Sequence, residues 1–293
     1  MILKYLNPKN DFVFKKIFGQ DKNRDLLISM LNLVLGKKFH KKIKDVRFLP
    51  TILPPDVNDN KYGIVDVLCE DEDGCKYIVE MQVAKQDDFT MRAQHYATKV
   101  FANQLPSGGQ YKNLKEVIFL AFCDFEIFEG DEHYKSNFVN YDPDKCRTLK
   151  GLSYTFIDLP KFEKQRSRDP QALSLEEKFY YFLHHAEEMR MVEIWALANK
   201  DPFLTKTAEQ AYSANFTAEE IEGYNKAVRQ ESTAKSILIA AKEEGIKEGI
   251  KEGEKKGEKR GERKGIEKTI KLLVKKGIIS EEEGQKQLKA LEK

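Results

Sequence analysis

The stretch VDVLCEDEDGCKYIVEMQV, residues 65–83, holds two apolar runs on either side of an acidic segment, and its pairing decides the fold. Both runs are rich in β-branched and aromatic residues, which favour strands over helices. Between them, residues 72–74 end in Gly74, and glycine readily takes the left-handed conformation that a three-residue hairpin loop needs. The stretch therefore predicts a β-hairpin.

The length of the loop decides which side chains share a face of this hairpin. With residues 72–74 as the loop, paired residues have numbers that add to 146, so Asp66 lies directly opposite Glu80. Gln82 lies on the same face, because side chains two apart in a strand point the same way. The hairpin is thus expected to gather two carboxylates and an amide.

Two opposed carboxylates point to a bound cation. Their Cβ atoms would lie roughly 4.5–5.5 Å apart, and the two charges repel each other unless a cation lies between them. Carboxylate oxygens suit Mg²⁺ or Mn²⁺, which keep bound waters that can be presented to a phosphodiester. A shift of one residue in the register is the alternative, and it would leave Asp66 and Glu80 as separate, solvated side chains.

The sequence around the hairpin predicts a mixed α/β fold. Apolar spacing predicts helices before and after the hairpin, and continuous apolar or β-branched runs predict further strands. In chain order these are helices over 7–19 and 23–36, a strand over 43–50, the two hairpin strands, a helix over 87–105, and strands over 116–122 and 154–160. The order is α-β-β-β-α-β with a helical opening, followed by the further strand over 154–160, and the first three strands form a meander.

The C-terminal part is expected to be helical. Ser174 and Glu177 have the spacing of a capping box, and no strand pattern follows. Glycine recurs every four residues from Gly245 to Gly265. We therefore divide the chain into a core over 1–165, a helical extension over 166–241 and a charged glycine-repeat tail over 242–293.

Composition excludes several classes of protein. The chain has 293 residues and a formal net charge of only +2, so overall charge does not by itself indicate a nucleic-acid or membrane partner. No segment approaches the roughly eighteen apolar residues of a membrane span. The four cysteines lack the spacing of a zinc site, and we expect a cytoplasmic protein with reduced thiols. They are Cys69, Cys75, Cys123 and Cys146.

These motifs carry a resemblance to a known family. Asp66 on the second strand and Glu80-x-Gln82 on the third resemble the PD-(D/E)XK nuclease superfamily. The segments over 10–19, 65–83, 92–105 and 108–122, together with the glycine repeat, resemble more narrowly the bacterial recombination-promoting nucleases, also described as PD-(D/E)XK family transposases. This resemblance covers residues 7–160 and extends to the tail only in the glycine repeat.

The resemblance implies a restriction-endonuclease-like core and a metal-dependent DNA endonuclease that serves DNA recombination or mobile elements. DNA would be the partner, and Asp66 and Glu80 would bind Mg²⁺ (or Mn²⁺). The catalytic set would be Asp66, Glu80 and Gln82.

Gln82 departs from the family pattern, which commonly has lysine at this position. A neutral amide cannot act as a base or supply positive charge, so Gln82 would orient a water or a phosphate oxygen. Lys85 is an odd number of residues away and belongs to the opposite strand face. One alternative to an active nuclease follows: a weak or inactive nuclease-fold protein that binds or regulates DNA. A second alternative rests on the tail, which would make the protein an oligomeric partner scaffold anchored by the core.

Other residues are candidates for supporting roles. Asp11 could add a carboxylate from the first helix, although an acidic residue there is often a helix cap. Arg92 and Tyr96 share a helix face and, by resemblance, could steady the site or contact phosphate, but Tyr96 also belongs to the apolar stripe. The adjacent His184 and His185 should point to different helix faces and not share a metal.

The tail concentrates the positive charge of the chain. Residues 242–276 contain thirteen Lys or Arg and eight Glu, a net charge of +5 against +2 for the whole chain, so the rest carries −3. Each glycine costs roughly 1 kcal/mol relative to alanine in a helix. The tail is therefore either a helix that binds phosphates or forms a homo-oligomer through its glycines, or a solvated, partly disordered tether.

Overall fold

A computed structural model describes residues 4–39, 41–54, 62–106 and 108–290. The chain divides into two compact units, Met1–Val228 and Arg229–Lys293. Each unit is described by itself below.

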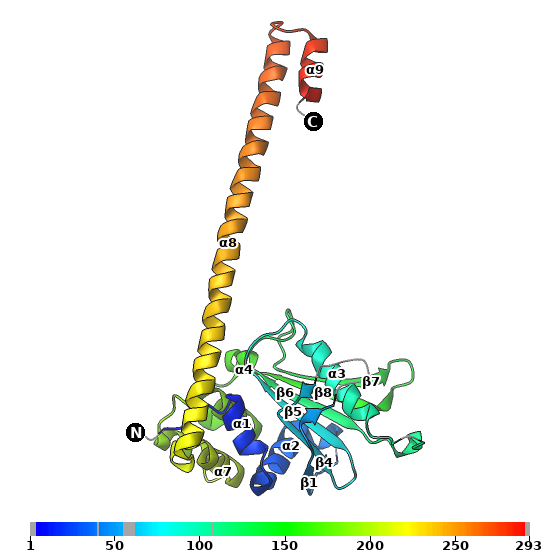
Figure 1. Cartoon of the computed structure of the whole chain (residues 1–293), viewed down its shortest axis with the longest axis vertical. Helices are drawn as coiled ribbons and strands as arrows, with labels where there is room; N and C mark the ends of the chain where they lie inside the picture. Colours follow the sequence, from blue (N-terminus) through cyan, green and yellow to red (C-terminus); the bar gives the residue numbers. More distant parts are fainter. Residues whose placement is uncertain (1–3, 40, 55–61, 107, 291–293) are drawn as a thin grey trace. The chain divides into compact units, whose positions relative to one another are not determined.

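A six-stranded mixed sheet forms the centre of the first unit (Figure 1). In spatial order its strands are β1 (Val46–Phe48), β4 (Val67–Asp71), β5 (Lys76–Gln82), β6 (Val117–Cys123), β8 (Arg147–Asp158) and β7 (Lys135–Asp142). The pairs β1·β4, β4·β5 and β7·β8 are antiparallel, whereas β5, β6 and β8 run parallel. The predicted α/β class is confirmed.

The hairpin formed by β4 and β5 has the predicted register. Val67 pairs with Val79 and Leu68 pairs with Ile78, so the residue numbers add to 146. Gly74 has a φ of 86°, which is the left-handed conformation that the loop requires. The alternative register, shifted by one residue, is therefore wrong.

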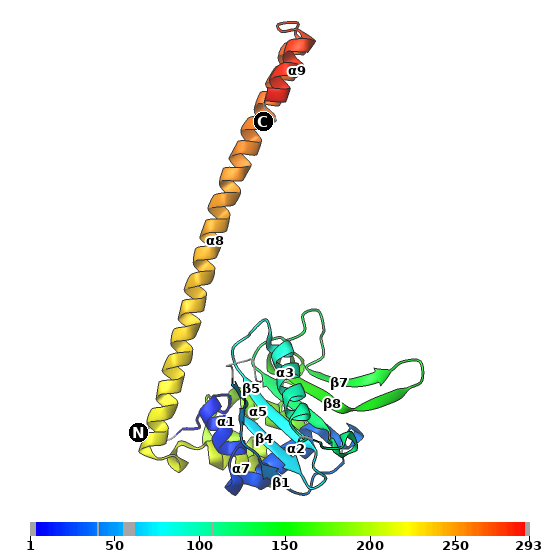
Figure 2. The same ribbon diagram turned by 45° about the vertical axis from the view of Figure 1, so that its right-hand side comes forward.

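Two strand pairings differ from the sequence-based expectation. A small hairpin of β2 (Ile52–Leu53) and β3 (Gly63–Ile64) lies between β1 and β4 in the chain. The amide of Val65 donates to the Thr51 carbonyl at 3.0 Å, so the first hairpin strand is split before Asp66. Strand β7 (Figure 2) was also not predicted. Several of its side chains are exposed, and no apolar run marks it.

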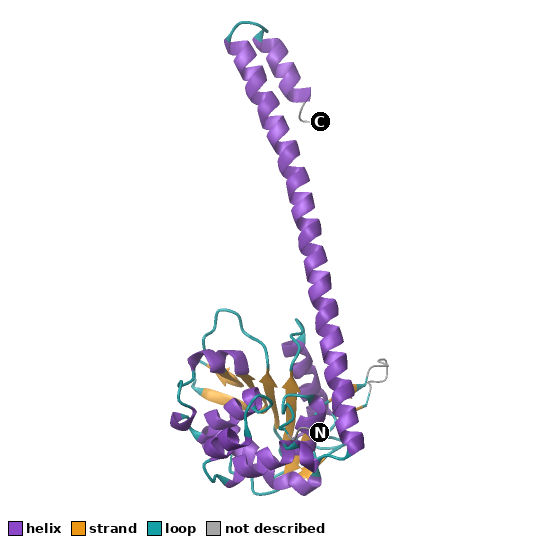
Figure 3. Cartoon of the chain, turned by 90° about the vertical axis from the view of Figure 1, so that its left-hand side faces the viewer, coloured by secondary structure: helices purple, strands orange, loops and turns teal. Residues whose placement is uncertain are grey.

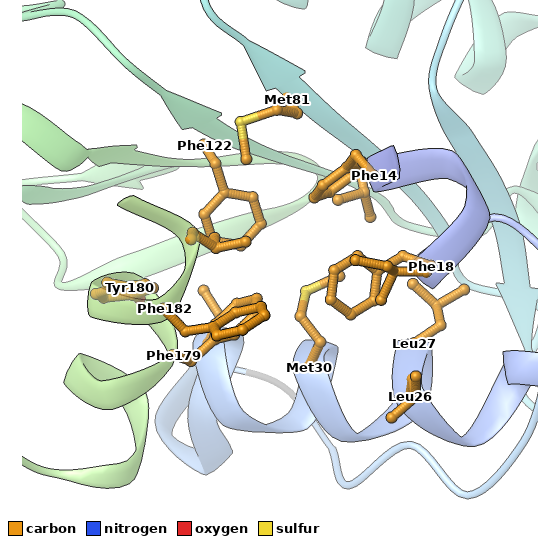
Figure 4. Packing of buried hydrophobic residues seen from close by; sticks show 14 of the residues in the cluster. Phe14, Phe18, Leu26, Leu27, Met30, Met81, Phe122, Phe179, Tyr180 and Phe182 are labelled. Carbon is orange, nitrogen blue, oxygen red and sulfur yellow. The ribbon is translucent and has the colours of Figure 1, made fainter. Parts of the chain in front are cut away.

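Helices from both ends of the first unit cover one face of the sheet. They include α1 (Asp11–Phe18), α2 (Arg24–Phe39), α4 (Leu159–Gln165), α5 (Leu175–His185), α6 (Met191–Ala198) and α7 (Pro202–Ala211). Phe14 and Phe179 each pack near Phe122 of β6, with ring centroids 6.2 and 5.7 Å from it (Figure 4). The predicted capping box at Ser174 and Glu177 is present. Side chains of residues 175–211 thus share one apolar cluster with the N-terminal helices.

The opposite face of the sheet is covered by α3 (Phe89–Ala102). Its buried side chains pack on alternate residues of β5 and β6, as the helical spacing predicts. Glu80 lies between Val79 and Met81 in β5, and these two neighbours belong to the other face. Glu80 therefore points to the α3 side of the sheet.

The second unit is helical (Figure 3). Helix α8 (Ala218–Lys275) begins in the first unit, and its part in the second unit contains the whole glycine repeat. Helix α9 (Glu281–Ala290) folds back on the end of α8. Ile270 is buried and Gly284 lies against Val274. None of the described helices is long and apolar enough to cross a membrane.

Candidate active site

Asp66 and Glu80 lie side by side where β4 begins. The backbone amide of Asp66 donates to Glu80 Oε1 at 3.4 Å, and Asp66 Oδ2 accepts from the Met81 amide at 2.8 Å. The Asp66 side chain is 12% exposed and Glu80 is 7% exposed. The hairpin register thus places two acidic side chains together in a largely buried position.

Burial makes the ionised forms of both carboxyl groups costly. Burial, followed by a hydrogen bond with Asp11, raises the pKa of Asp66 to about 6. Burial, followed by the negative charge of Asp66, raises the pKa of Glu80 to about 8. Near neutral pH this pair favours the binding of either a proton or a cation.

Helix α1 brings two more charged groups to this pair. Asn10 is the N-cap and its side chain accepts from the Phe12 amide at 3.1 Å, so Asp11 is not the cap but the first helical residue. Lys15 Nζ lies 2.7 Å from Asp11 Oδ1 and 3.1 Å from Asp66 Oδ1. Lys15 was missed in the sequence, where only its four-residue spacing from Asp11 marks it.

Gln82 is held by α3 rather than left free. Arg92 Nη2 donates to Gln82 Oε1 at 2.9 Å, and Gln82 Nε2 donates to the Ala84 carbonyl at 3.0 Å. Arg92 also bonds Gln86, and its guanidinium lies 5.2 Å from the centre of the Phe89 ring. A positive charge thus lies next to the position where the family pattern has lysine, and the field of Arg92 reaches Glu80.

Tyr96 and Lys85 have other surroundings. The half-buried Tyr96 ring packs against Gly63 of β3, where an added Cβ would lie 2.9 Å from Tyr96 Cε1. This contact fits the packing interpretation of Tyr96. Lys85 Nζ pairs with Glu129 Oε1 at 2.9 Å, and both side chains are exposed.

The end of β6 adds a charged group beside Gln82. The amide of Asp124 donates to the Gln82 carbonyl at 2.9 Å. Its carboxylate lies 2.9 Å from Lys9 Nζ and 3.5 Å from His184 Nδ1. His184 and His185 have different partners, Asp124 and Glu163, although their ring centroids lie only 4.8 Å apart at the end of α5. That they do not share a metal stays a prediction.

Comparison with known proteins adds one family match. Residues 8–241 match the family described as PD-(D/E)XK nuclease family transposase. No curated protein and no solved structure matches the chain.

Proposed function

Because the chain belongs to the PD-(D/E)XK nuclease family transposases, we propose that it is a divalent-metal-dependent deoxyribonuclease. It would hydrolyse phosphodiester bonds of DNA in recombination or in the activity of mobile elements. The observation that carries this proposal is the contact of the nearly buried Asp66, just before β4, with the buried Glu80 of β5. Strands β1, β4, β5 and β6 with α1 and α3 would form the restriction-endonuclease-like core.

The residues at this pair fit a hard divalent cation. Asp66 and Glu80 offer carboxylate oxygens, and Asp11 makes a hydrogen bond with Asp66. The raised pKa values of Asp66 and Glu80 reflect the cost of burying negative charge. Asp66 and Glu80 would hold Mg²⁺ or Mn²⁺. When bound, such a cation supplies a water of lowered pKa and positive charge for the phosphate oxygens.

Two cations of the chain compensate for the lysine that Gln82 replaces. Gln82 would position the guanidinium of Arg92 through its carbonyl oxygen, since its own amide group is bonded to Ala84. A guanidinium can donate two hydrogen bonds to one phosphate. Lys15 would hold Asp66 ionised and orient its carboxylate. Gln82 is thus a positioning residue in this proposal, not the base.

A plasmid assay tests the proposal. We expect purified full-length protein to nick supercoiled DNA with Mg²⁺ or Mn²⁺ and not with EDTA. Absence of cleavage at every metal concentration, together with retained DNA binding, would instead favour the second candidate. That candidate is a nuclease-fold protein that binds DNA without turnover, and the glutamine at position 82 is the observation that favours it.

A further inference from the structure

A second group of metal-ligating side chains lies between α4 and the end of α5. Glu163, His184 and His185 each offer one ligand atom, and these atoms lie within 4.8 Å of one another. His185 Nε2 lies 2.8 Å from Glu163 Oε2. The three side chains are 22–29% exposed, so an ion could reach them from solvent.

The chemistry of this group differs from that of the carboxylate pair in β4 and β5. Two imidazoles and one carboxylate suit Zn²⁺ and its neighbours in the transition series better than Mg²⁺. Three protein ligands would leave a fourth, tetrahedral position for water. His184 Nδ1 is buried and lies 3.5 Å from the Asp124 carboxylate, which is where metal-bound histidines usually have an outer partner, although the two make no hydrogen bond.

The carboxylate of Glu163 is paired with the guanidinium of Arg166. Arg166 Nε and Nη2 lie 2.7 and 2.6 Å from the two oxygens of Glu163. The guanidinium also lies 4.7 Å from the centre of the Tyr181 ring, which is a surface on which it can remain after it releases Glu163. Arg166 and a metal would therefore compete for the same oxygens.

We propose that Glu163, His184 and His185 form a binding site for Zn²⁺ or a similar transition-metal ion, separate from the proposed catalytic pair. The ion would join α4 to α5. It would also fix His184 against Asp124, whose amide is bonded to Gln82, and so brace the end of β6. The ion pair of Glu163 with Arg166 is the metal-free state of this site.

Titration of metal-free, full-length protein with Co²⁺ tests this site. We expect visible absorption bands of tetrahedral Co²⁺ that saturate at one equivalent and disappear when Zn²⁺ is added. His184→Gln and His185→Gln should each abolish the bands, whereas Asp66→Asn should keep them. His133→Gln is the matched control, because that imidazole is 84% exposed and pairs with Asp131.

Arg166→Gln provides a second, independent variant. Removing the competing guanidinium should tighten Co²⁺ and Zn²⁺ binding, roughly 10-fold or more for a charge in contact with a ligand. Zn²⁺ should also raise the melting temperature of the wild type and of Asp66→Asn. The proposal is wrong if the wild type shows no saturable band, or if the band survives in a folded histidine variant. Neither readout depends on nuclease activity, so the two proposals fail separately.

Discussion

Asp66 is the residue through which the proposed chemistry is most directly tested. Asp66→Asn keeps the size of the side chain and removes its carboxyl group, whose pKa is raised to about 6 by burial. We expect metal-dependent plasmid cleavage to fall roughly 100-fold or more, by analogy with the loss of other charge-stabilising groups. The metal-free variant should fold and should melt no lower than the wild type.

Asp87→Asn is the control for this variant, because Asp87 is an exposed carboxylate near the same end of β5. It should cleave like the wild type. Wild-type cleavage by a folded Asp66→Asn protein would remove Asp66 from the site.

Glu80 should make the stability of the metal-free protein depend on pH. Its pKa is raised from 4.5 to about 8, so the folded state favours the protonated form. This stabilising contribution is fully present below about pH 4.5 and is lost as the pH rises through about 8. The melting temperature of metal-free wild type should therefore fall over this window, and Glu80→Gln should flatten the fall.

The measurement is thermal unfolding in EDTA across pH 5–9. Mg²⁺ should stabilise the wild type more at the alkaline end, because the cation competes with the proton for the same oxygens. Parallel curves for wild type and Glu80→Gln would mean that Glu80 ionises normally.

Lys15 is expected to set the ionisation of Asp66. Its ammonium group lies 3.1 Å from Asp66 Oδ1 and counteracts the effect of burial on the pKa of that carboxyl. Lys15→Gln should therefore raise the pKa of Asp66 further and shift the acid limb of the cleavage profile to higher pH. We expect activity at pH 6.5 to fall roughly 10-fold, as for other groups that orient a metal ligand.

Lys4→Gln is the matched control, since Lys4 pairs with Glu187 elsewhere in the first unit. A cleavage profile of Lys15→Gln that coincides with that of Lys4→Gln would assign Lys15 to the surface of α1 alone.

At the scale of elements, loop length explains why the central part of the fold was predictable. The three-residue loop ending in Gly74 allows one register, and that register, continued one residue beyond Val67 and Val79, brings Asp66 beside Glu80. In contrast, β7 carries exposed side chains such as Phe138 and Tyr141, so neither alternation nor a buried run marks it. The contact between Arg92 and Gln82 depends on where α3 crosses β5, which no local pattern specifies.

Alanine substitutions at two glycines of the second unit should have opposite effects on the stability of the α8–α9 hairpin. A Cβ at Gly284 would lie 2.5 Å from Val274 Cγ2, whereas nothing lies within 4 Å of a Cβ at Gly257. Gly284→Ala should therefore loosen α9 by roughly 1–3 kcal/mol through overpacking. Gly257→Ala should stabilise α8 by up to about 1 kcal/mol, because alanine has the higher helix propensity.

Circular dichroism melts and hydrogen exchange over residues 270–290 can measure both effects. Gly257→Ala is the control for Gly284→Ala, because the substitution is the same and only the surroundings differ. Equal stabilisation by the two alanines would show that α9 does not pack on Val274 in solution.

At the scale of the whole molecule, charge and packing divide the chain differently. Phe14, Phe122 and Phe179 belong to one cluster, so helix α5 of the predicted extension shares its core with the N-terminal helices. The compact unit ends at Val228, and the predicted boundaries at 165/166 and 241/242 stay predictions.

Positive charge is concentrated in residues 242–276, which carry +5 while the rest of the chain carries −3. The part of the chain with the carboxylate pair is therefore not the part that would attract DNA most strongly.

Removing the tail separates these two roles. Deletion of residues 242–293 should weaken DNA binding and flatten its dependence on salt, because fewer counterions are released when fewer basic residues contact phosphates. Cleavage at saturating DNA should continue at nearly the full-length rate, since Asp66 and Glu80 lie in the first unit.

A full-length variant with Arg260, Arg263 and Lys264 changed to glutamine distinguishes charge from the helix itself. These side chains are exposed on α8, so the substitutions should leave the helix intact and reproduce part of the loss in affinity and salt slope. Fluorescence anisotropy at several salt concentrations measures DNA affinity and its salt dependence, and light scattering measures the molecular mass.

A Cβ added at any of the repeat glycines from Gly245 to Gly265 would have nothing within 4 Å, so a partner helix could approach them closely. If deletion leaves affinity unchanged and instead converts an oligomer to a monomer, the tail serves assembly through these glycines and not DNA binding.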